Sequence, residues 1–304
     1  MAKELRIGII GYDTSHVPAF TKLINDPSDP FHVAGGKVVC GFPSFSPDLK
    51  ASYSRVEGFK KDMATKWGIP VVSSIEEMLG QVDAVLLESV DGRRHLAEAR
   101  PVIEAGKPLY IDKPLAADYK EAAEIVRLAR EKGCPVFSSS SLRYDVNIRA
   151  ILADPELGEV FSCDAFSPAT LDPTNPGLFW YGVHGVEILF TFMGTGCEKV
   201  TCYTSEDSDV IVGTWAGGRL GTMRGTRSGA HDYGVTAFGE GKVMQTAYSH
   251  DVPLYSQLLE QIMPFFQGGP APVDPEETLE IMAFMQAALI SGQEGREVTL
   301  SEVR

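Results

Sequence analysis

The sequence predicts an α/β protein of two domains, in which a doubly wound parallel sheet is followed by an α/β domain with an open, mainly antiparallel sheet. Three observations support this prediction. The chain has 304 residues, more than the roughly 250 at which a single hydrophobic core stops growing. Short apolar runs alternate with helical patterns in the N-terminal half, which is typical of parallel βαβ units. Later strand patterns follow one another with glycine turns, which favours antiparallel pairing.

The N-terminal domain, residues 1–136, is expected to begin with a buried strand. The run from Leu5 to Gly11 is apolar and ends in glycine, so a tight turn should follow it. The Ser- and Pro-rich stretch from Phe42 to Tyr53 predicts a loop. Asp118 and Glu121 have the spacing of a helix capping box. The expected strands span residues 5–11, 37–41, 69–72, 84–87, 109–111 and 136–138, and the expected helices span 17–24, 56–67, 75–79, 96–105 and 119–132.

The C-terminal domain, residues 137–304, is expected to consist of strands and one long terminal helix. That helix starts at Asp274-Pro275-Glu276-Glu277, where proline suits the first helical turn, and it should end near Gly292. The expected strands span residues 159–166, 199–204, 210–215, 219–226, 235–239 and 242–246.

Composition and charge narrow the classes of partner. The formal net charge is −14, which disfavours nucleic acid and anionic membrane surfaces, because both require clustered Lys and Arg. No apolar run reaches the length needed to span a membrane. The five cysteines lack the spacing of zinc or redox motifs, so buried thiols in the cytoplasm are expected. A small-molecule ligand fits these properties best.

Asp112-Lys113-Pro114 follows the apolar run that ends at Ile111. This position is the carboxyl edge of the predicted parallel sheet, where α/β proteins bind ligands. Pro114 favours an extended conformation at Lys113 and permits a cis bond between the two, so the backbone sets the direction of the ammonium group. A lysine fixed in this way can shift its pKa and transfer protons.

The turn after the first strand has the position of a dinucleotide-binding turn but an unusual composition. A helix N-terminus there offers free N–H groups to a pyrophosphate. The pattern G-x-G-x-x-G would start at Gly11, yet Asp13 and His16 occupy the second and third glycine positions. Thr14 and Ser15 can still donate hydrogen bonds, and Asp13 can alternatively cap the helix. No acidic residue ends the second strand, where Ser44 could favour a 2′-phosphate or lie in a solvated loop.

Three separated segments resemble one known family. Residues 105–108 and 112–116 are similar to the A-G-K-(H/P) and E-K-P-(L/I)-A motifs of the glucose-fructose oxidoreductase, inositol dehydrogenase and rhizopine catabolism protein family, Gfo/Idh/MocA. Residues 182–187 resemble its G-x-H-x-x-D segment, and residues 270–289 resemble its terminal helix. The resemblance implies an N-terminal Rossmann domain and NAD(P)-dependent chemistry on sugars or cyclitols. It also implies a homo-oligomer formed through the C-terminal sheet.

The resemblance also implies roles for individual residues. Lys113 would be the catalytic lysine and His184 the proton-transfer histidine. The residues expected to bind NAD or NADP, from the resemblance together with the turn, are Gly8, Gly11, Tyr12, Asp13, Thr14, Ser15, Ser44, Ser89, His95, Asp112 and Pro114.

A second group of residues is expected to line the substrate site. Arg143 and Tyr144 match an Arg-Phe pair of the family at the domain junction, although an arginine there can equally form a structural ion pair. Trp180 stands where the family has an aspartate before the histidine, and it offers a flat surface for a sugar or for core packing. Tyr181, His231 and Tyr233 complete the group, with a solvated loop as the alternative for the last two.

The sequence therefore predicts an NAD(P)-dependent oxidoreductase that acts on a secondary alcohol of a sugar, cyclitol or sugar derivative. Two alternatives stay open: a non-redox or ligand-binding family member with a degenerate dinucleotide site, and a redox-neutral enzyme that retains NAD. The pairs Asp13 with His16 and His184 with Glu187 have a spacing that can hold a metal, but each lacks a third ligand, so no metal site is predicted.

Overall fold

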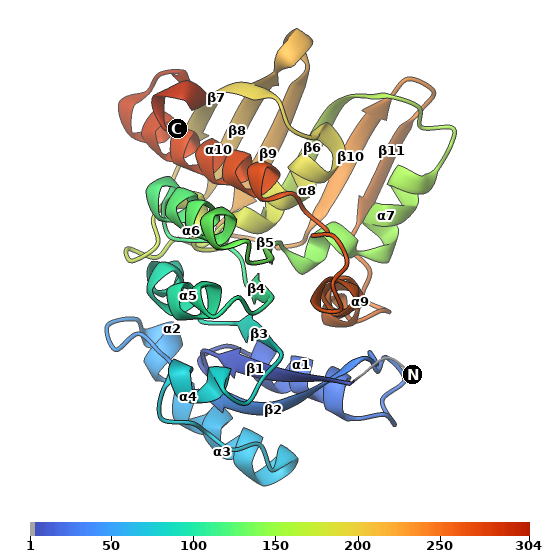
Figure 1. Ribbon diagram of the computed structural model, residues 1–304. Helices are drawn as coiled ribbons and strands as arrows, with labels where there is room; N and C mark the ends of the chain where they lie inside the picture. The colour runs from blue at the N-terminus through green and yellow to red at the C-terminus, as the bar shows by residue number, and fades with distance from the viewer. Residues whose placement is uncertain (1–3) are drawn as a thin grey trace. The chain divides into compact units, whose positions relative to one another are not determined.

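Two separate sheets organise the chain, and the computed structural model describes them over residues 4–304 (Figure 1). The predicted domain start at residues 1–3 lies outside this range. The chain forms two compact units: the first comprises the chain up to Ala116, Glu121–Ser138 and Pro253–Pro275, and the second comprises Ala117–Lys120, Ser139–Val252 and Glu276–Arg304. This division differs from the predicted boundary after residue 136, because the segment from Pro253 to Pro275 returns to the first unit.

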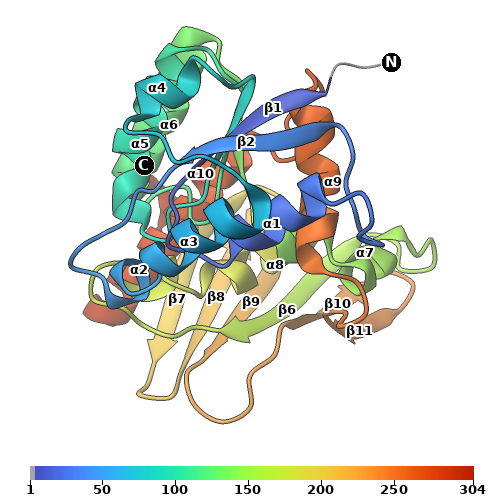
Figure 2. The same ribbon diagram turned by 90° about the horizontal axis from the view of Figure 1, so that it is seen from below.

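The first unit contains a five-stranded parallel sheet in the order β2-β1-β3-β4-β5. The apolar runs form its strands because both faces are covered; Ile7, Ile9 and all four residues of β3 are fully buried. Helix α1 contacts α3 and α9, and all three lie together in Figure 2. The elements are β1 (Leu5–Ile10), α1 (His16–Asn25), β2 (Gly36–Phe42), α2 (Lys50–Tyr53), α3 (Val56–Trp67), α4 (Ile75–Leu79), β3 (Ala84–Leu87), α5 (His95–Glu104), β4 (Leu109–Ile111), α6 (Tyr119–Lys132), β5 (Val136–Ser138) and α9 (Leu254–Phe266).

Three parts of this unit differ from the sequence-based expectation. The stretch from Phe42 to Tyr53, expected to be a loop, ends in the short helix α2. The expected strand at residues 69–72 is wrong, because Val71 forms only an isolated bridge with Gly41. Helix α9 was not predicted at all. Its ring contact from Phe265 to Phe137 of β5, at 4.7 Å between centroids, helps to fix it to the sheet.

The second unit contains a seven-stranded sheet in the order β11-β10-β6-β9-β8-β7-β12 (Figure 1). All pairs are antiparallel except β6 with β9, so the predicted fold class is confirmed for both sheets. The elements are α7 (Val146–Ala153), β6 (Val160–Pro168), α8 (Val183–Met193), β7 (Cys197–Thr204), β8 (Ser208–Trp215), β9 (Leu220–Thr226), β10 (Gly234–Gly239), β11 (Val243–Ala247), α10 (Pro275–Glu294) and β12 (Val298–Thr299).

The two faces of this second sheet are unequal. On one face α8 contacts β6, β9 and β10, and the rings of Phe190, Trp215 and Phe284 form its core. The opposite face carries exposed apolar side chains, and the strand register assigns Tyr203, Leu220 and Val243 to this same face. One face is therefore the hydrophobic core of the unit, and the other is open.

The structure also tests the expectations drawn from composition. Among residues 4–304, no helix combines the length and the apolar character needed to cross a bilayer. The five cysteines are free thiols, four of them buried, and burial is the main cause that raises the pKa of Cys40 and of Cys134 to about 11.

Candidate functional site

Lys113 lies directly after β4, at the carboxyl edge of the parallel sheet, and its bond to Pro114 is cis. Its side chain is 13% exposed, and Nζ lies 3.9 Å from Oδ2 of Asp112. Asp112 is buried, and its Oδ1 accepts a hydrogen bond from the Tyr110 hydroxyl at 3.3 Å. The motif thus holds a sparingly exposed ammonium group beside a fixed carboxylate.

The turn after β1 requires glycine at its first position. Gly11 has a φ of +89°, and a Cβ there would lie 2.3 Å from the backbone nitrogen of Ser89. Gly8 is a packing position inside β1, where a Cβ would lie 2.7 Å from Sδ of Met78. Tyr12 is fully buried against Gly41, and burial raises the pKa of its hydroxyl. Gly11 thus brings the turn close to the end of β3, whereas Tyr12 belongs to the core.

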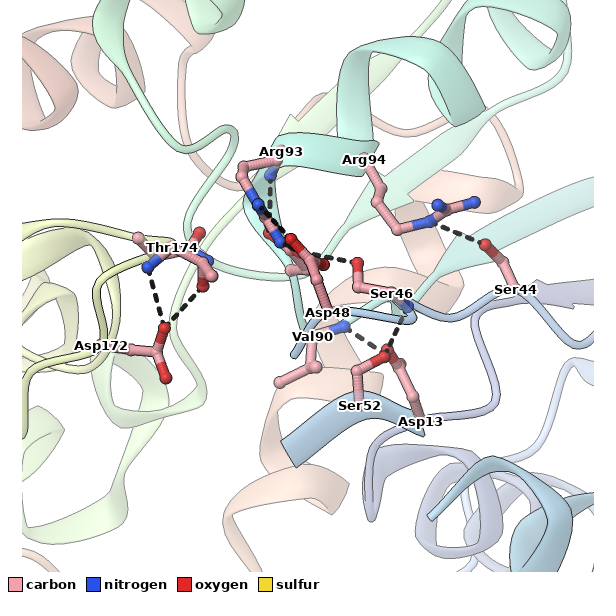
Figure 3. Close-up of polar contacts among 12 residues, drawn as sticks. Asp13, Ser44, Ser46, Asp48, Ser52, Val90, Arg93, Arg94, Asp172 and Thr174 are labelled. Atoms are coloured by element: carbon pink, nitrogen blue, oxygen red, sulfur yellow. Dashed lines mark hydrogen bonds and ion pairs between the residues drawn. The ribbon is translucent and has the colours of Figure 1, made fainter. Parts of the chain in front are cut away.

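The Asp13 carboxylate is directed at Ser52 and Val90 (Figure 3). The side chain is fully buried, and its carboxylate accepts hydrogen bonds from Oγ of Ser52 at 2.5 Å and from the backbone N–H of Val90 at 3.1 Å. Burial raises the pKa of Asp13, and the two hydrogen bonds oppose that rise. Asp13 therefore joins the turn to helix α2 and to the segment after β3.

The N-terminus of α1 offers the positive end of its dipole but few free N–H groups, because Pro18 has no N–H and the His16 N–H donates to Thr14. The helix has ten residues, Ser15 before it is exposed, and its first turn contains no acidic side chain. Thr14, which is buried, accepts a hydrogen bond from the His16 N–H through Oγ1 at 3.4 Å. Free N–H groups and the positive end of the helix dipole are the features that bind a pyrophosphate at this place in an α/β sheet.

The loop after β2 is fixed by hydrogen bonds to the segment after β3 (Figure 3). Ser44 donates to Glu98 and accepts from Nε of Arg94 at 3.0 Å. Ser46 donates to Asp91 at 2.6 Å, and Arg93 pairs with both Asp91 and Asp48. Ser44 is 4% exposed, and its hydroxyl is hydrogen-bonded within this network. The Arg94 side chain, which is 35% exposed, is the more accessible group at the end of β2.

Ser89 and His95 connect the ends of β3 and β4. The His95 ring is fully buried, with Nε2 2.7 Å from the carbonyl oxygen of Ser89 and Nδ1 3.0 Å from that of Pro114. The Ser89 hydroxyl donates to Glu98 at 2.6 Å. These two residues position the backbone around Lys113.

His16, Glu88 and Asp112 meet at the same edge of the sheet. Nδ1 of His16 lies 3.1 Å from Oε2 of Glu88 and 3.1 Å from Oδ2 of Asp112. Burial alone would lower the pKa of His16, but the charge of Asp112 and the hydrogen bonds raise it well above its usual range. Burial raises the pKa of Glu88, and the hydrogen bond with His16 opposes the rise. Glu88 was not predicted; its place after a buried apolar strand was the available signal.

His184 lies in the second unit. The family has an aspartate shortly before this histidine, where the chain has Trp180, and here the partner of the imidazole is a serine hydroxyl. Its Nδ1 lies 2.7 Å from Oγ of Ser140. The rings of Tyr181 and Tyr233 stand edge-on to the imidazole at 5.2 and 5.7 Å, and the two tyrosine hydroxyls are hydrogen-bonded at 3.0 Å. Ser140, which sequence reasoning missed, therefore orients the histidine within an aromatic group.

The other residues predicted to line the substrate site differ in burial. Arg143 is buried and pairs with Glu187 at 2.8 Å and Glu277 at 2.7 Å, which favours the structural ion pair over a substrate contact. Tyr144 is buried, and burial raises its pKa to about 12. Trp180 is partly exposed, whereas His231 is exposed and lies 3.2 Å from the Thr226 hydroxyl.

The sheet order, the glycine turn and the helix N-terminus together define a Rossmann-type domain, the class that binds dinucleotides at this edge. Residues 5–140 match the family model of the Gfo/Idh/MocA oxidoreductases, described as an oxidoreductase family with an NAD-binding Rossmann fold. These residues, just under half of the chain, match the Gfo/Idh/MocA family, as the sequence motifs predicted. The expectation of NAD or NADP as cofactor is confirmed at the level of this family.

Curated relatives resemble part of the chain. It is 31% identical over 148 residues to 1,5-anhydro-D-fructose reductase of Ensifer adhaerens, which covers 47% of the chain and 41% of that protein. It is 26% identical over 166 residues to inositol 2-dehydrogenase of Corynebacterium glutamicum strain R, which covers 53% of the chain and 44% of that protein. The chain thus matches less than half the length of these relatives.

Solved structures resemble the whole chain in fold. GenD2 from gentamicin A biosynthesis, in complex with NAD, has a TM-score of 0.79 at 19% identity, covering 98% of this chain and 97% of its own. A myo-inositol 2-dehydrogenase from Lactobacillus plantarum has a TM-score of 0.79 at 14% identity, covering 98% and 99%. At these identities the likeness shows the two-sheet architecture alone.

Proposed function

We propose that the chain is an NAD(P)-dependent oxidoreductase that acts on a secondary alcohol of a sugar, cyclitol or sugar derivative. The observation that carries the proposal is Lys113, a 13% exposed ammonium group at the carboxyl edge of the parallel sheet, beside the buried Asp112. This edge is where Rossmann-type sheets bind their ligands. The family of residues 5–140 and the names of the relatives support the same reaction class.

The proposed dinucleotide site lies at the turn and the start of α1. The backbone N–H groups of Thr14 and Ser15 would bind the pyrophosphate, with Gly11 permitting its close approach and α1 supplying the positive end of its dipole. Asp112 would bind the nicotinamide ribose, and Arg94 lies near the end of β2, where a 2′-phosphate would be bound. Bound in this site, the nicotinamide ring supplies a hydride acceptor.

Lys113 is proposed to handle the proton of the reaction. In its neutral form the amine takes the hydroxyl proton of the substrate, which allows the carbon to lose hydride. In the reverse direction the ammonium returns this proton to the carbonyl oxygen. His184, in the second unit, is proposed as a further proton-transfer group, with Ser140 orienting its ring through Nδ1.

The proposed substrate is a small polyhydroxylated ring. Tyr181 and Tyr233 surround His184 with aromatic edges and hydroxyl groups, which suit the mixed apolar and polar surface of a sugar. The open face of the second sheet supports a homo-oligomer formed through that face. A cytoplasmic location stays a prediction.

The experiment that tests this function is a calorimetric titration of the nucleotide-stripped protein with NAD, NADH, NADP and NADPH. We expect micromolar binding of one redox pair, followed by substrate-dependent formation of reduced cofactor in a screen of sugars and cyclitols. Binding without net hydride transfer would favour the redox-neutral alternative. Absence of binding by all four would favour the non-redox or ligand-binding alternative.

Asp13→Gly, which restores the glycine of the dinucleotide pattern, is expected to leave dinucleotide affinity within about threefold, because the carboxylate is directed at Ser52 and Val90. It should instead lower the free energy of unfolding by about 1–3 kcal/mol, since the buried Ser52 hydroxyl and Val90 N–H lose their acceptor. Urea denaturation and the same titration measure both effects. Asp13→Asn, which keeps one acceptor oxygen, is the matched control; tenfold tighter binding by Asp13→Gly would show that the carboxylate repels phosphate.

A further inference from the structure

Three potential metal ligands converge from three separate elements of the first unit. His16 is the first residue of α1, Glu88 follows β3 and Asp112 follows β4. Their Nδ1, Oε2 and Oδ2 atoms all lie within 4.8 Å of one another, and both carboxylate oxygens are 3.1 Å from Nδ1. Residues distant in sequence are thus brought to one point by the parallel sheet.

Two carboxylate oxygens of the cluster face the same ring nitrogen of His16. Nδ1 of His16 can carry one hydrogen, yet two carboxylate oxygens lie at equal distances from it. Glu88 is fully buried, and among the described residues its Oε1 has no hydrogen-bond partner. A buried carboxylate oxygen without a partner is costly, and coordination to a cation removes that cost.

We propose that His16, Glu88 and Asp112 bind a divalent first-row cation, with Zn²⁺ or Mn²⁺ as the class of ion. Bonds of about 2.0–2.2 Å from imidazole nitrogen and carboxylate oxygen place neighbouring ligand atoms about 3.0–3.5 Å apart. The two separations of 3.1 Å in the cluster agree with this geometry. The two carboxylates balance the charge of the ion. The ion replaces the hydrogen on Nδ1 of His16, which otherwise lies between the two carboxylate oxygens.

The surroundings of the cluster suit a site of this kind. The His16 ring stacks on Phe20 with centroids 5.3 Å apart and meets the edge of Tyr255 at 4.6 Å, which fixes the ring orientation. The Tyr110 hydroxyl donates to Oδ1 of Asp112 and leaves Oδ2 directed at the cluster. Such supporting contacts hold metal ligands in place.

A bound ion would keep open coordination positions, because three protein ligands do not complete the shell of a divalent first-row metal. These positions would accept water or an oxygen of a small hydroxylated ligand. Oδ2 of Asp112 also lies 3.9 Å from Nζ of Lys113. The ion would therefore be bound by the residue that precedes the proposed proton-transfer lysine in the sequence. The inference concerns metal binding alone and does not depend on the proposed redox function.

The test is metal binding by the full chain without dinucleotide or substrate. Protein treated with chelator and then dialysed is titrated calorimetrically with Zn²⁺ and with Mn²⁺, and bound metal is counted by mass spectrometry. We expect one ion per chain with a micromolar or lower Kd, weakened at least tenfold by His16→Gln, Glu88→Gln and Asp112→Asn. The controls are His32→Gln and Glu98→Gln, a histidine and a buried carboxylate outside the cluster that should retain wild-type affinity.

Three results would overturn the proposal: no stoichiometric binding by the wild type, a Kd above a millimolar, or unchanged affinity in all three cluster variants. Circular dichroism establishes that each variant is folded. If the cluster variants do not fold, X-ray absorption of the zinc-loaded wild type decides the question. One imidazole with oxygen ligands is expected, and sulfur or several imidazoles would place the ion elsewhere.

Discussion

Replacing Lys113 by alanine is expected to lower kcat by about 10²- to 10⁴-fold, the usual contribution of a positioned acid–base group. The chemical step loses its proton acceptor, whereas the turn at Gly11 and the start of α1 are untouched. Dinucleotide affinity should therefore stay within about threefold of the wild type. Steady-state kinetics and calorimetric titration measure the two quantities separately.

Two further variants make this prediction specific. Lys113→Arg keeps the positive charge but cannot act as a neutral amine at ordinary pH, so it should be nearly as inactive as the alanine variant. Lys120→Ala removes an exposed lysine seven residues away and should leave kcat unchanged. Normal turnover by Lys113→Ala would remove the central claim of the proposed function.

Replacing Arg143 by methionine is expected to lower the free energy of unfolding by about 3–5 kcal/mol. The guanidinium pairs with Glu187 at 2.8 Å, and both side chains are buried, so the variant leaves the Glu187 carboxyl buried without its cation. Urea denaturation followed by fluorescence measures the loss. Arg149→Met, at an exposed position on the next helix, is the control and should change stability by less than about 0.5 kcal/mol.

A double variant distinguishes the structural role from substrate binding. Changing Glu187 to methionine together with Arg143 removes both buried charges and should recover much of the lost stability. If Arg143→Met were instead fully stable but had a raised KM, the guanidinium would be a substrate contact, as the family resemblance implied.

Local pattern was sufficient for most of the fold because the strands of the first sheet are buried on both faces. Continuous apolar runs such as Ala84–Leu87 have few other interpretations once turn residues flank them. Residues 69–72 form a similar run but pair with Gly41 through a single bridge. Helix α9 follows the strands of the second unit and returns to the first, and short-range pattern contains no signal for such a return.

The candidate site was predictable where a motif carries the chemistry. Lys113 and His184 lie in segments with family spacing, so the motifs alone were enough to propose both, and their roles stay predictions. Ser140 and Glu88 were not predicted, because only the folded chain brings Ser140 to His184 and Glu88 to His16. Tyr12 shows the reverse case: its position in the turn suggested a cofactor contact, but the side chain fills the core beside Gly41.

Helix α9 also bears on how the protein is made in the cell. It supplies Tyr255 and Phe265, whose rings contact His16, Phe20 and Phe137 of the first unit, yet it is translated more than a hundred residues after β5. A ribosome adds roughly 5–20 residues per second, so the nascent first unit waits on the order of ten seconds for its last helix. During that interval Phe20 and Phe137 lack the rings of α9 that cover them in the folded protein. Chaperones that bind apolar surface therefore have time to act on the emerging chain.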